Sequence, residues 1–294
     1  MKNLFSQKNN PPHNPVQWTK IIRPVSGWFD INFGELWTYR DLIMLFVRRD
    51  FVAIYKQTIL GPLWYLIQPI MTTLIFTIIF GKIAKIPTDG LPPILFYLSG
   101  VVAWRYFSDC LQKTSNTFVD NAQVFGKVYF PRLTVPLSVV ISNLISFAIQ
   151  LLLFACFWAY FYANGATIQV RDASLLILPF LVLQMAVLGL GCGIIVSSLT
   201  TKYRDLTQLV GFGVQLWMYA TPVVYPSSIV PEKYQWLIAL NPMAPIIEAF
   251  RYLLLGVGTV NPVGLLASVL ITFSLLFIGV MLFSKIEKSF MDTV

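Results

Sequence analysis

Residues 135–161 have the sequence VPLSVVISNLISFAIQLLLFACFWAYF, which contains no charged side chain. A helix that crosses the hydrocarbon core of a bilayer needs about 20 apolar residues, because the core is about 30 Å thick and each helical residue rises 1.5 Å. This stretch is therefore long enough to cross a membrane as one helix.

Five other segments of the chain have a similar apolar character. The composition agrees, since only 12% of the residues are charged, whereas soluble domains carry about 25%. The second segment, at 93–110, is interrupted by Arg105 and Asp109. The fifth segment, at 206–225, stops at Thr221-Pro222. We predict an all-α polytopic fold with six transmembrane helices, at 63–82, 93–110, 135–161, 174–199, 206–225 and 263–284.

The loops between these segments carry an uneven share of the positive charge. If the N-terminus is inside, the inner segments hold 15 of the 21 Lys and Arg residues. Cytoplasmic loops of membrane proteins are enriched in Lys and Arg. This bias predicts that both termini are cytoplasmic, and it accounts for the net charge of +8.

The part of the chain before the first span has two sections. Residues 1–34 are polar, rich in Asn and Pro, and without the apolar core of a signal peptide, which predicts a flexible cytosolic arm. Residues 35–57 fit an amphipathic helix at the inner interface, with Asp41, Arg48 and Lys56 on its polar face. Asp50 falls in the apolar stripe, so it requires a partner, and Arg49 is a candidate.

The outer segment 226–262 is too apolar for a simple loop. Its apolar stretches at 234–240 and 244–257 are separated by Asn241-Pro242, and the second contains only two charges, Glu248 and Arg251. We predict two short re-entrant helices that dip into the outer leaflet and return. Breaks of this kind persist at membrane depth only where protein or water covers them.

The sequence lacks the motifs of an enzyme. Gly126-Lys127 is followed by Val128, so no phosphate-binding loop is present, and the one histidine, His13, lies in the polar arm. We expect no catalytic residue, no metal site and no cofactor in this chain. A membrane-embedded enzyme would depend on scattered carboxylates such as Asp109, Asp120, Asp205 and Glu248.

Four stretches, taken in order, resemble a known family. They are YRDLIMLFVRRDFVAIYKQTILGPLW at 39–64, VFGKVYFPRLTVPL at 124–137, TKYRDLTQLVGFGVQLWMYATPVVYP at 201–226 and ALNPMAPIIEAFRYLLLG at 239–256. They are similar to the permeases of type-2 ABC exporters for polysaccharide, which export O-antigen, teichoic acid or capsule. The resemblance covers about residues 40–294, and the arm at 1–34 lies outside it.

This resemblance implies a transport subunit of the bacterial inner membrane. The chain would form a homodimer with a channel at its interface, and it would bind two separate ATPase subunits that hold ATP and Mg²⁺. Its cargo would be a lipid-linked polysaccharide of the O-antigen type. Membrane lipids are further expected partners, and nucleic acid is not.

A lipid-linked glycan carries a pyrophosphate, which basic side chains could bind. Arginine suits phosphate because its planar fork donates two parallel hydrogen bonds. The alternative is that these residues anchor helix ends to anionic lipid headgroups. The candidate set, which includes the Leu-Gly turn that the resemblance places before the first span, is Arg48, Arg49, Lys56, Leu60, Gly61, Lys127 and Arg132.

Energy from a separate ATPase would have to enter through the inner loops. We expect a short rigid helix at about 114–128 that docks on the ATPase, and a second contact at the loop before the fifth span. Solvated loops without a partner, or simple membrane anchoring, are the alternatives. The candidate coupling residues are Thr114, Ser115, Asn116, Asp120, Tyr203, Arg204 and Asp205.

Aromatic side chains are the third candidate group. Sugar rings present apolar faces that pack on aromatic rings, so a channel lined with them would let a glycan slide. Ordinary core packing is the alternative for each one. The candidates are Phe96, Tyr97, Trp104, Tyr106, Trp217 and Tyr219. Gly189 and Gly193 have the spacing of a close helix contact, which we expect to lie within one subunit.

Other cargoes and classes stay open at this point. Teichoic acid, capsule or a small hydrophobic drug would use the same architecture. A membrane-embedded glycan-modifying enzyme or a passive channel would belong to a different class of protein.

Overall fold

The computed structural model describes residues 33–57, 59–170, 174–200, 203 and 205–293, and in these residues the chain is helical with no β-strand. Of the predicted arm, residues 1–32 lie outside the described part. The helices are α1 (Phe33–Thr38), α2 (Arg40–Gln57), α3 (Trp64–Phe76), α4 (Pro93–Ser115), α5 (Thr117–Asp120), α6 (Ala122–Phe125), α7 (Thr134–Ala163), α8 (Ser174–Thr200), α9 (Leu206–Ala220), α10 (Glu232–Leu240), α11 (Met243–Leu255) and α12 (Pro262–Thr293). All six segments predicted to be spans are helical.

Four helical stretches within the described residues are long and apolar enough to cross a membrane. They are Gly61–Ile83, which joins α3 to the turns on either side of it, Thr134–Ala163, Leu176–Thr200 and Pro262–Ile286. The bent pair α10 and α11 would add a fifth if it were one span. The structure therefore supports four or five spans by length and composition, rather than the predicted six.

Helix α4 falls short of an apolar span because of three charged residues, which are spaced four apart. Arg105 pairs with Asp109 at 3.7 Å and donates to Gln68 of α3. Lys113 donates from Nζ to the Oδ1 of Asn143 in α7 at 2.7 Å. Sequence reasoning ended this segment at residue 110, whereas the helix continues to Ser115. Its charged side chains have partners within α4 and on α3 and α7.

Helix α9 is shorter than predicted. It ends at Ala220, and Thr221 has extended backbone with φ −104° and ψ 145°. The reason is Pro222, whose ring disfavours helical geometry in the preceding residue.

Helix α8 packs between α4 and α12, and glycines permit the close approach. A Cβ on Gly189 would lie 2.8 Å from the Cys110 Cβ of α4, and one on Gly193 would lie 2.6 Å from the Thr114 Cβ. A Cβ on Gly191 would lie 2.8 Å from the backbone nitrogen of Leu276 in α12. The prediction that these glycines pack within one subunit is confirmed.

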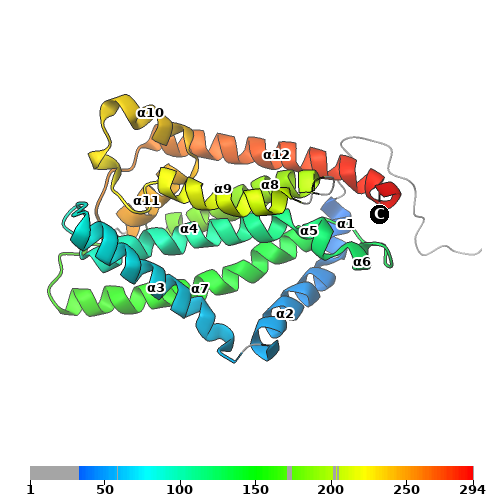
Figure 1. Ribbon diagram of the computed structural model, residues 1–294, viewed down its shortest axis with the longest axis horizontal. Helices are drawn as coiled ribbons and strands as arrows, with labels where there is room; N and C mark the ends of the chain where they lie inside the picture. Colours follow the sequence, from blue (N-terminus) through cyan, green and yellow to red (C-terminus); the bar gives the residue numbers. More distant parts are fainter. Residues whose placement is uncertain (1–32, 58, 171–173, 201–202, 204, 294) are drawn as a thin grey trace, which may run out of the picture. The chain divides into compact units, whose positions relative to one another are not determined.

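The short helices gather at the two ends of the long ones (Figure 1). We call the end with α1, α2, α5 and α6 the α2 end, and the end with α10 and α11 the α10 end. Helix α9 finishes and α12 begins at the α10 end (Figure 1). The candidate functional residues divide between these two ends.

The predicted amphipathic helix at 35–57 is present as two helices, with a break at Tyr39. Phe46 and Val47 are buried on the predicted apolar face, and Arg48 on the opposite face is exposed. Asp50 has the partner that it requires, because the Arg49 Nη2 lies 2.9 Å from its Oδ1.

Candidate functional site

An aromatic cluster joins the helices at the α2 end. We define the α2-end cluster as five buried rings from α2, α5, α6, the segment after α6 and α12: Phe46, Phe118, Phe125, Phe130 and Phe283. The Phe118 and Phe283 rings stack with centroids 4.6 Å apart, and Phe130 lies 5.6 Å from Phe125 and 5.8 Å from Phe46. The loop helices and α2 therefore share one core, which sequence reasoning did not predict.

Two of the predicted pyrophosphate-binding arginines lie over this cluster. The Arg49 guanidinium is 4.8 Å from the Phe46 ring centroid, and that of Arg132 is 5.6 Å from the Phe125 centroid. Arg48, Lys56 and Lys127 are exposed. The structure thus gathers Arg49 and Arg132, which are far apart in sequence, on one aromatic platform.

The predicted Leu-Gly turn connects α2 to α3. Leu60 is partly exposed, and Gly61 is buried with φ +47°. This left-handed backbone favours glycine, because a Cβ is disfavoured there. Gly61 begins a tight turn, Gly61–Leu63, that leads directly into α3.

The segment expected to dock on an ATPase is not one helix. Residues 114 and 115 belong to the last turn of α4 and are buried, and the Thr200 Oγ1 donates to the Ser115 carbonyl at 3.0 Å. Asn116 occupies the N-cap position of α5, but its side chain makes no capping hydrogen bond to a described residue. Asn121 then separates α5 from α6, because its amide donates to the Thr117 carbonyl at 3.0 Å and competes with the helix.

Three of the other coupling candidates are exposed at the ends of helices. Asp120 closes α5, Tyr203 follows α8, and Asp205 precedes α9. Neighbouring protein atoms partly desolvate the Asp120 carboxylate, which raises its pKa above the ordinary value. Arg204 lies outside the described residues. Within the described residues, no three His, Cys, Asp or Glu side chains cluster as metal ligands would.

Most of the candidate channel aromatics lie in the core of the chain. The four on α4 are all buried: Phe96, Tyr97, Trp104 and Tyr106. Trp217 of α9 is half-buried against Trp104 at 6.0 Å between centroids, and Tyr219 is exposed. A ring without exposed surface offers no contact to a cargo in this arrangement, so only Trp217 and Tyr219 carry the channel hypothesis forward.

The α10 end is organised around a buried arginine that sequence reasoning noted only as a charge in an apolar stretch. Arg251 of α11 is 5% exposed. It donates to the carbonyls of Pro222 and Val223, at 2.7 Å each, and its guanidinium lies 3.8 Å from the Phe96 ring centroid. Gly100 of α4 leaves the space for it, since a Cβ there would lie 2.7 Å from the Arg251 Nη2.

Asn241 holds the break between α10 and α11, whose axes differ by 98°. Its Oδ1 accepts from the Trp217 indole at 3.1 Å and from the Met243 backbone at 3.0 Å. Its Nδ2 donates to the Thr221 hydroxyl at 2.7 Å. The two predicted outer helices are confirmed as helices, and the Asn241-Pro242 signal for the break between them is borne out.

Known proteins resemble the chain over most of its length. Its relatives include proteins named "O-antigen export system permease protein RfbA". One from Klebsiella pneumoniae is 28% identical over 89% of this chain and 96% of its own length, and one from Myxococcus xanthus is 28% identical over 74% and 81%. The "Polysialic acid transport protein KpsM" of Escherichia coli is 22% identical over 80% of this chain and 89% of its own length.

The family match agrees with the helical architecture. Several helices are long and apolar enough to cross a bilayer, as an integral membrane protein requires. The model of the ABC-2 type transporter family matches residues 41–255, a range that includes both the α2 end and the α10 end. The chain is therefore an integral membrane protein that belongs to the ABC-2 type transporter family.

Proposed function

We propose that this chain is the channel-forming subunit of an ATP-driven exporter that moves lipid-linked polysaccharide of the O-antigen type across the bacterial inner membrane. The observation that carries the proposal is the similarity to O-antigen export permeases over almost their whole length. The alternative cargo is capsular polysaccharide, which the similarity to the polysialic acid transport protein favours.

The proposed topology has six spans with both termini in the cytoplasm. Helices α4, α7, α9 and α12 run between the two ends, and α3 runs toward the α10 end from the point where α2 finishes (Figure 1). Helix α8 packs between α4 and α12. The charged side chains of α4 have partners within α4 and on the neighbouring helices. These partners lower the free energy of placing the charges in the membrane, so α4 can be a span. The exposed basic residues of α2 support a cytoplasmic location for the α2 end.

In this topology α10 and α11 form a re-entrant pair and not a span. Helix α9 finishes and α12 begins at the same end of the long helices (Figure 1). A chain that leaves and returns on one side cannot cross the membrane once in between, so the pair is not a single span. The 98° bend and the hydrogen bonds of Asn241 suit a pair of helices that turns back at that end.

The proposed assembly contains two copies of this chain and two ATPase subunits, which would bind ATP and Mg²⁺. The sequence has no phosphate-binding loop of its own, so the energy has to come from a partner. Helix α9 offers a face for a second copy, because Leu209, Phe212, Leu216 and Tyr219 are exposed. Exposed apolar side chains of this kind mark either lipid or protein contacts.

In the proposed mechanism the basic residues at the α2 end bind the pyrophosphate of the cargo. Arg48, Arg49 and Arg132 would supply the bidentate contacts, with Lys56, Lys127 and the Leu60-Gly61 turn nearby. A push on α5 and α6 by the ATPase would reach α2 through the α2-end cluster, because its rings belong to all three helices. The glycan would then follow its lipid anchor into a channel between the two copies.

The test is deletion of the gene in its host, followed by assay of both surface polysaccharide and intracellular lipid-linked glycan. We expect loss at the surface and accumulation inside, with recovery when the wild-type gene is supplied on a plasmid. Unchanged surface polysaccharide in a strain without a second exporter would overturn the proposal. Loss in both places would point to a role in synthesis instead.

A further inference from the structure

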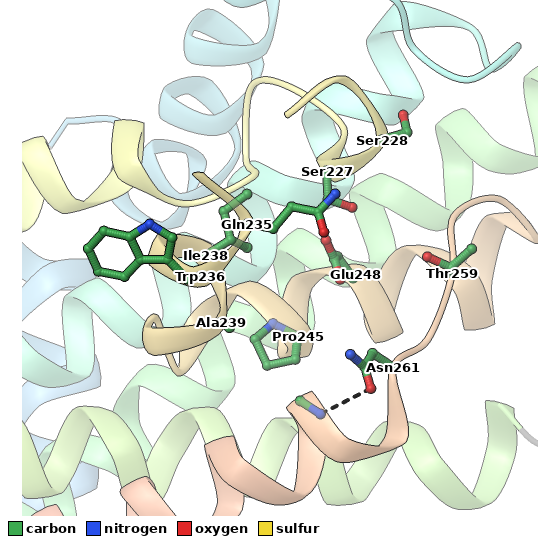
Figure 2. Close-up of a pocket in the computed structure, with 11 residues that line it drawn as sticks. Ser227, Ser228, Gln235, Trp236, Ile238, Ala239, Pro245, Glu248, Thr259 and Asn261 are labelled. Carbon is green, nitrogen blue, oxygen red and sulfur yellow. Dashed lines mark hydrogen bonds between the residues drawn. The ribbon is translucent and has the colours of Figure 1, made fainter. Parts of the chain in front are cut away.

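A cavity opens at the α10 end, between α10, α11 and the start of α12 (Figure 2). Its volume is about 440 Å³, which falls within the range of about 300–1,000 Å³ that is usual for small-molecule sites. The predicted pyrophosphate, channel and coupling residues do not line it. Its wall consists of Ser227, Ser228, Gln235, Trp236, Ile238, Ala239, Pro245, Glu248, Thr259, Asn261 and Gly264.

Glu248 of α11 gives this cavity its charge. Its Oε1 is buried and has no hydrogen-bond partner among the described residues, although Ser227 bonds to the carboxylate. Arg251, one turn further along, donates to the carbonyls of Pro222 and Val223 and to the Ser99 hydroxyl. A buried acceptor without a donor costs free energy, so a bound donor would stabilise the site.

Amide groups extend the polar wall on both sides of Glu248. The Asn261 Oδ1 accepts from the backbone nitrogens of Val263 and Gly264 at the start of α12, at 3.0 and 3.2 Å. This fixes the side chain so that its amide nitrogen points toward the cavity, and the Gln235 side chain lies beside Glu248 (Figure 2). The wall therefore offers acceptors and donors close together.

The wall also includes apolar side chains, with an aromatic ring at one side. Trp236 of α10 is 59% exposed, and Ile238, Ala239 and Pro245 add apolar surface to the wall. A sugar presents hydroxyl groups around its edge and apolar C–H faces, so it can use both kinds of surface at once.

We propose that this cavity is a subsite for one neutral or amino sugar residue of the exported glycan, an inference that rests on the proposed function. Hydroxyl or amine groups would donate to Glu248 and accept from the amide of Asn261. None of the described lining residues is Lys or Arg. Arg251, the cation that interacts with Glu248, lies outside the lining and bonds to Pro222, Val223 and Ser99. A carboxylate in the wall disfavours anions. The site therefore selects against phosphate groups and acidic sugars.

The test uses the purified complex of this chain with its ATPase subunits, in lipid nanodiscs, and isothermal titration calorimetry. The probes are the neutral oligosaccharides isolated after partial hydrolysis of the host's surface polysaccharide and, as an anionic comparison, a sialic acid dimer. We expect binding of the first probe and none of the second. Glu248→Gln should weaken binding about tenfold, because it removes the charge from the hydrogen bonds, and Trp236→Ala should weaken it several-fold.

A matched control is Tyr160→Ala, since Tyr160 lies near the end of α7 away from the cavity lining and is 63% exposed, much like Trp236. This control should bind the probe as the wild type does. Tyr160→Ala should also keep the basal ATPase rate, and Trp236→Ala tests the site through an exposed side chain should Glu248→Gln fail to fold.

The proposal is overturned if the wild type does not bind the neutral probe, if the sialic acid dimer binds equally well, or if both cavity variants match the wild type. The deletion experiment separates this outcome from failure of the transport proposal. A deletion strain that loses surface polysaccharide, combined with absence of binding, overturns the subsite and leaves the exporter function standing. A deletion strain that keeps its polysaccharide overturns the exporter function itself.

Discussion

Guanidinium groups have opposite surroundings at the two ends of this protein. At the α10 end Arg251 is buried, held by two backbone carbonyls and placed over the Phe96 ring. At the α2 end Arg48 is exposed, and Arg49 rests on Phe46 and pairs with Asp50 at the surface. Arginine therefore has a structural role at the α10 end, whereas at the α2 end it stays accessible to solvent.

The difference follows from the cost of removing a charge from water. A buried guanidinium is tolerated only when acceptors replace the lost hydration, and removal of one partner leaves the other unsatisfied. An arginine that rests its apolar stem and one face on a ring keeps its donors in contact with solvent. The predictions below test this contrast, beginning with the largest expected effect on stability.

Arg251→Met should destabilise the protein most. The change leaves the carbonyls of Pro222 and Val223 without their donor at a buried site. We expect the free energy of unfolding to fall by about 3–5 kcal/mol, measured by denaturant titration of the purified protein in detergent. Arg48→Met, at the exposed position, should change it by less than about 0.5 kcal/mol. Equal losses in the two variants would contradict the contrast.

Gly193→Ala should have the next largest effect, near the α2 end of the α4–α8 contact. The added Cβ would meet the Thr114 Cβ at 2.6 Å, so one helix must shift. We expect a loss of about 1–3 kcal/mol in the same titration. In Gly213→Ala the new Cβ would have no described atom within 4 Å beyond its own helix, and the better helix propensity of alanine should leave stability unchanged or raised by up to about 1 kcal/mol.

Phe118→Leu tests whether the α2-end cluster links the loop helices to α12. The substitution removes the stacking of Phe118 on Phe283 but keeps an apolar side chain. We expect a loss of about 1 kcal/mol and a lower rate of export per ATP hydrolysed. Phe273→Leu, at an exposed position of α12, should change neither quantity. A stability loss without a change in coupling would show that the cluster only packs.

The helices were predictable because apolar runs of membrane length leave few other structures available. Segments 63–82, 135–161 and 263–284 match the apolar helical stretches Gly61–Ile83, Thr134–Ala163 and Pro262–Ile286 with small shifts at the ends. The prediction failed at the end of α4, where charges suggested a boundary. Their partners Gln68 and Asn143 belong to other helices, and nothing in the local sequence indicates that pairing.

The candidate site was less predictable, because its main contacts join residues that are distant in sequence. The α2-end cluster brings Phe46, Phe118 and Phe283 together, and no local periodicity relates them. The acceptors of Arg251 are backbone carbonyls, which every residue has, so a sequence does not reveal which of them bind it. The Asn241-Pro242 break, by contrast, was visible, since both residue types favour turns.

Arg132→Gln should have the smallest effect on stability, less than about 0.5 kcal/mol, and a large effect on transport. If Arg132 contacts the pyrophosphate, loss of its charge-assisted hydrogen bonds should lower export about tenfold. Arg132→Lys should recover only part of the rate, because lysine keeps the charge but lacks the planar fork. The export rate of each variant is measured as the surface polysaccharide of a deletion strain that carries the variant gene on a plasmid.

Lys233 supplies the matched control at the α10 end, because it is exposed and its ammonium lies 5.8 Å from the Tyr234 ring centroid. Lys233→Gln removes the same charge from a similar setting, and we expect full export. Equal loss in Arg132→Gln and Lys233→Gln would mean that total positive charge, and not position, controls transport. Full export in Arg132→Gln would remove Arg132 from the headgroup site and leave Arg48 and Arg49 as the residues to test, because they are the remaining arginines of that set.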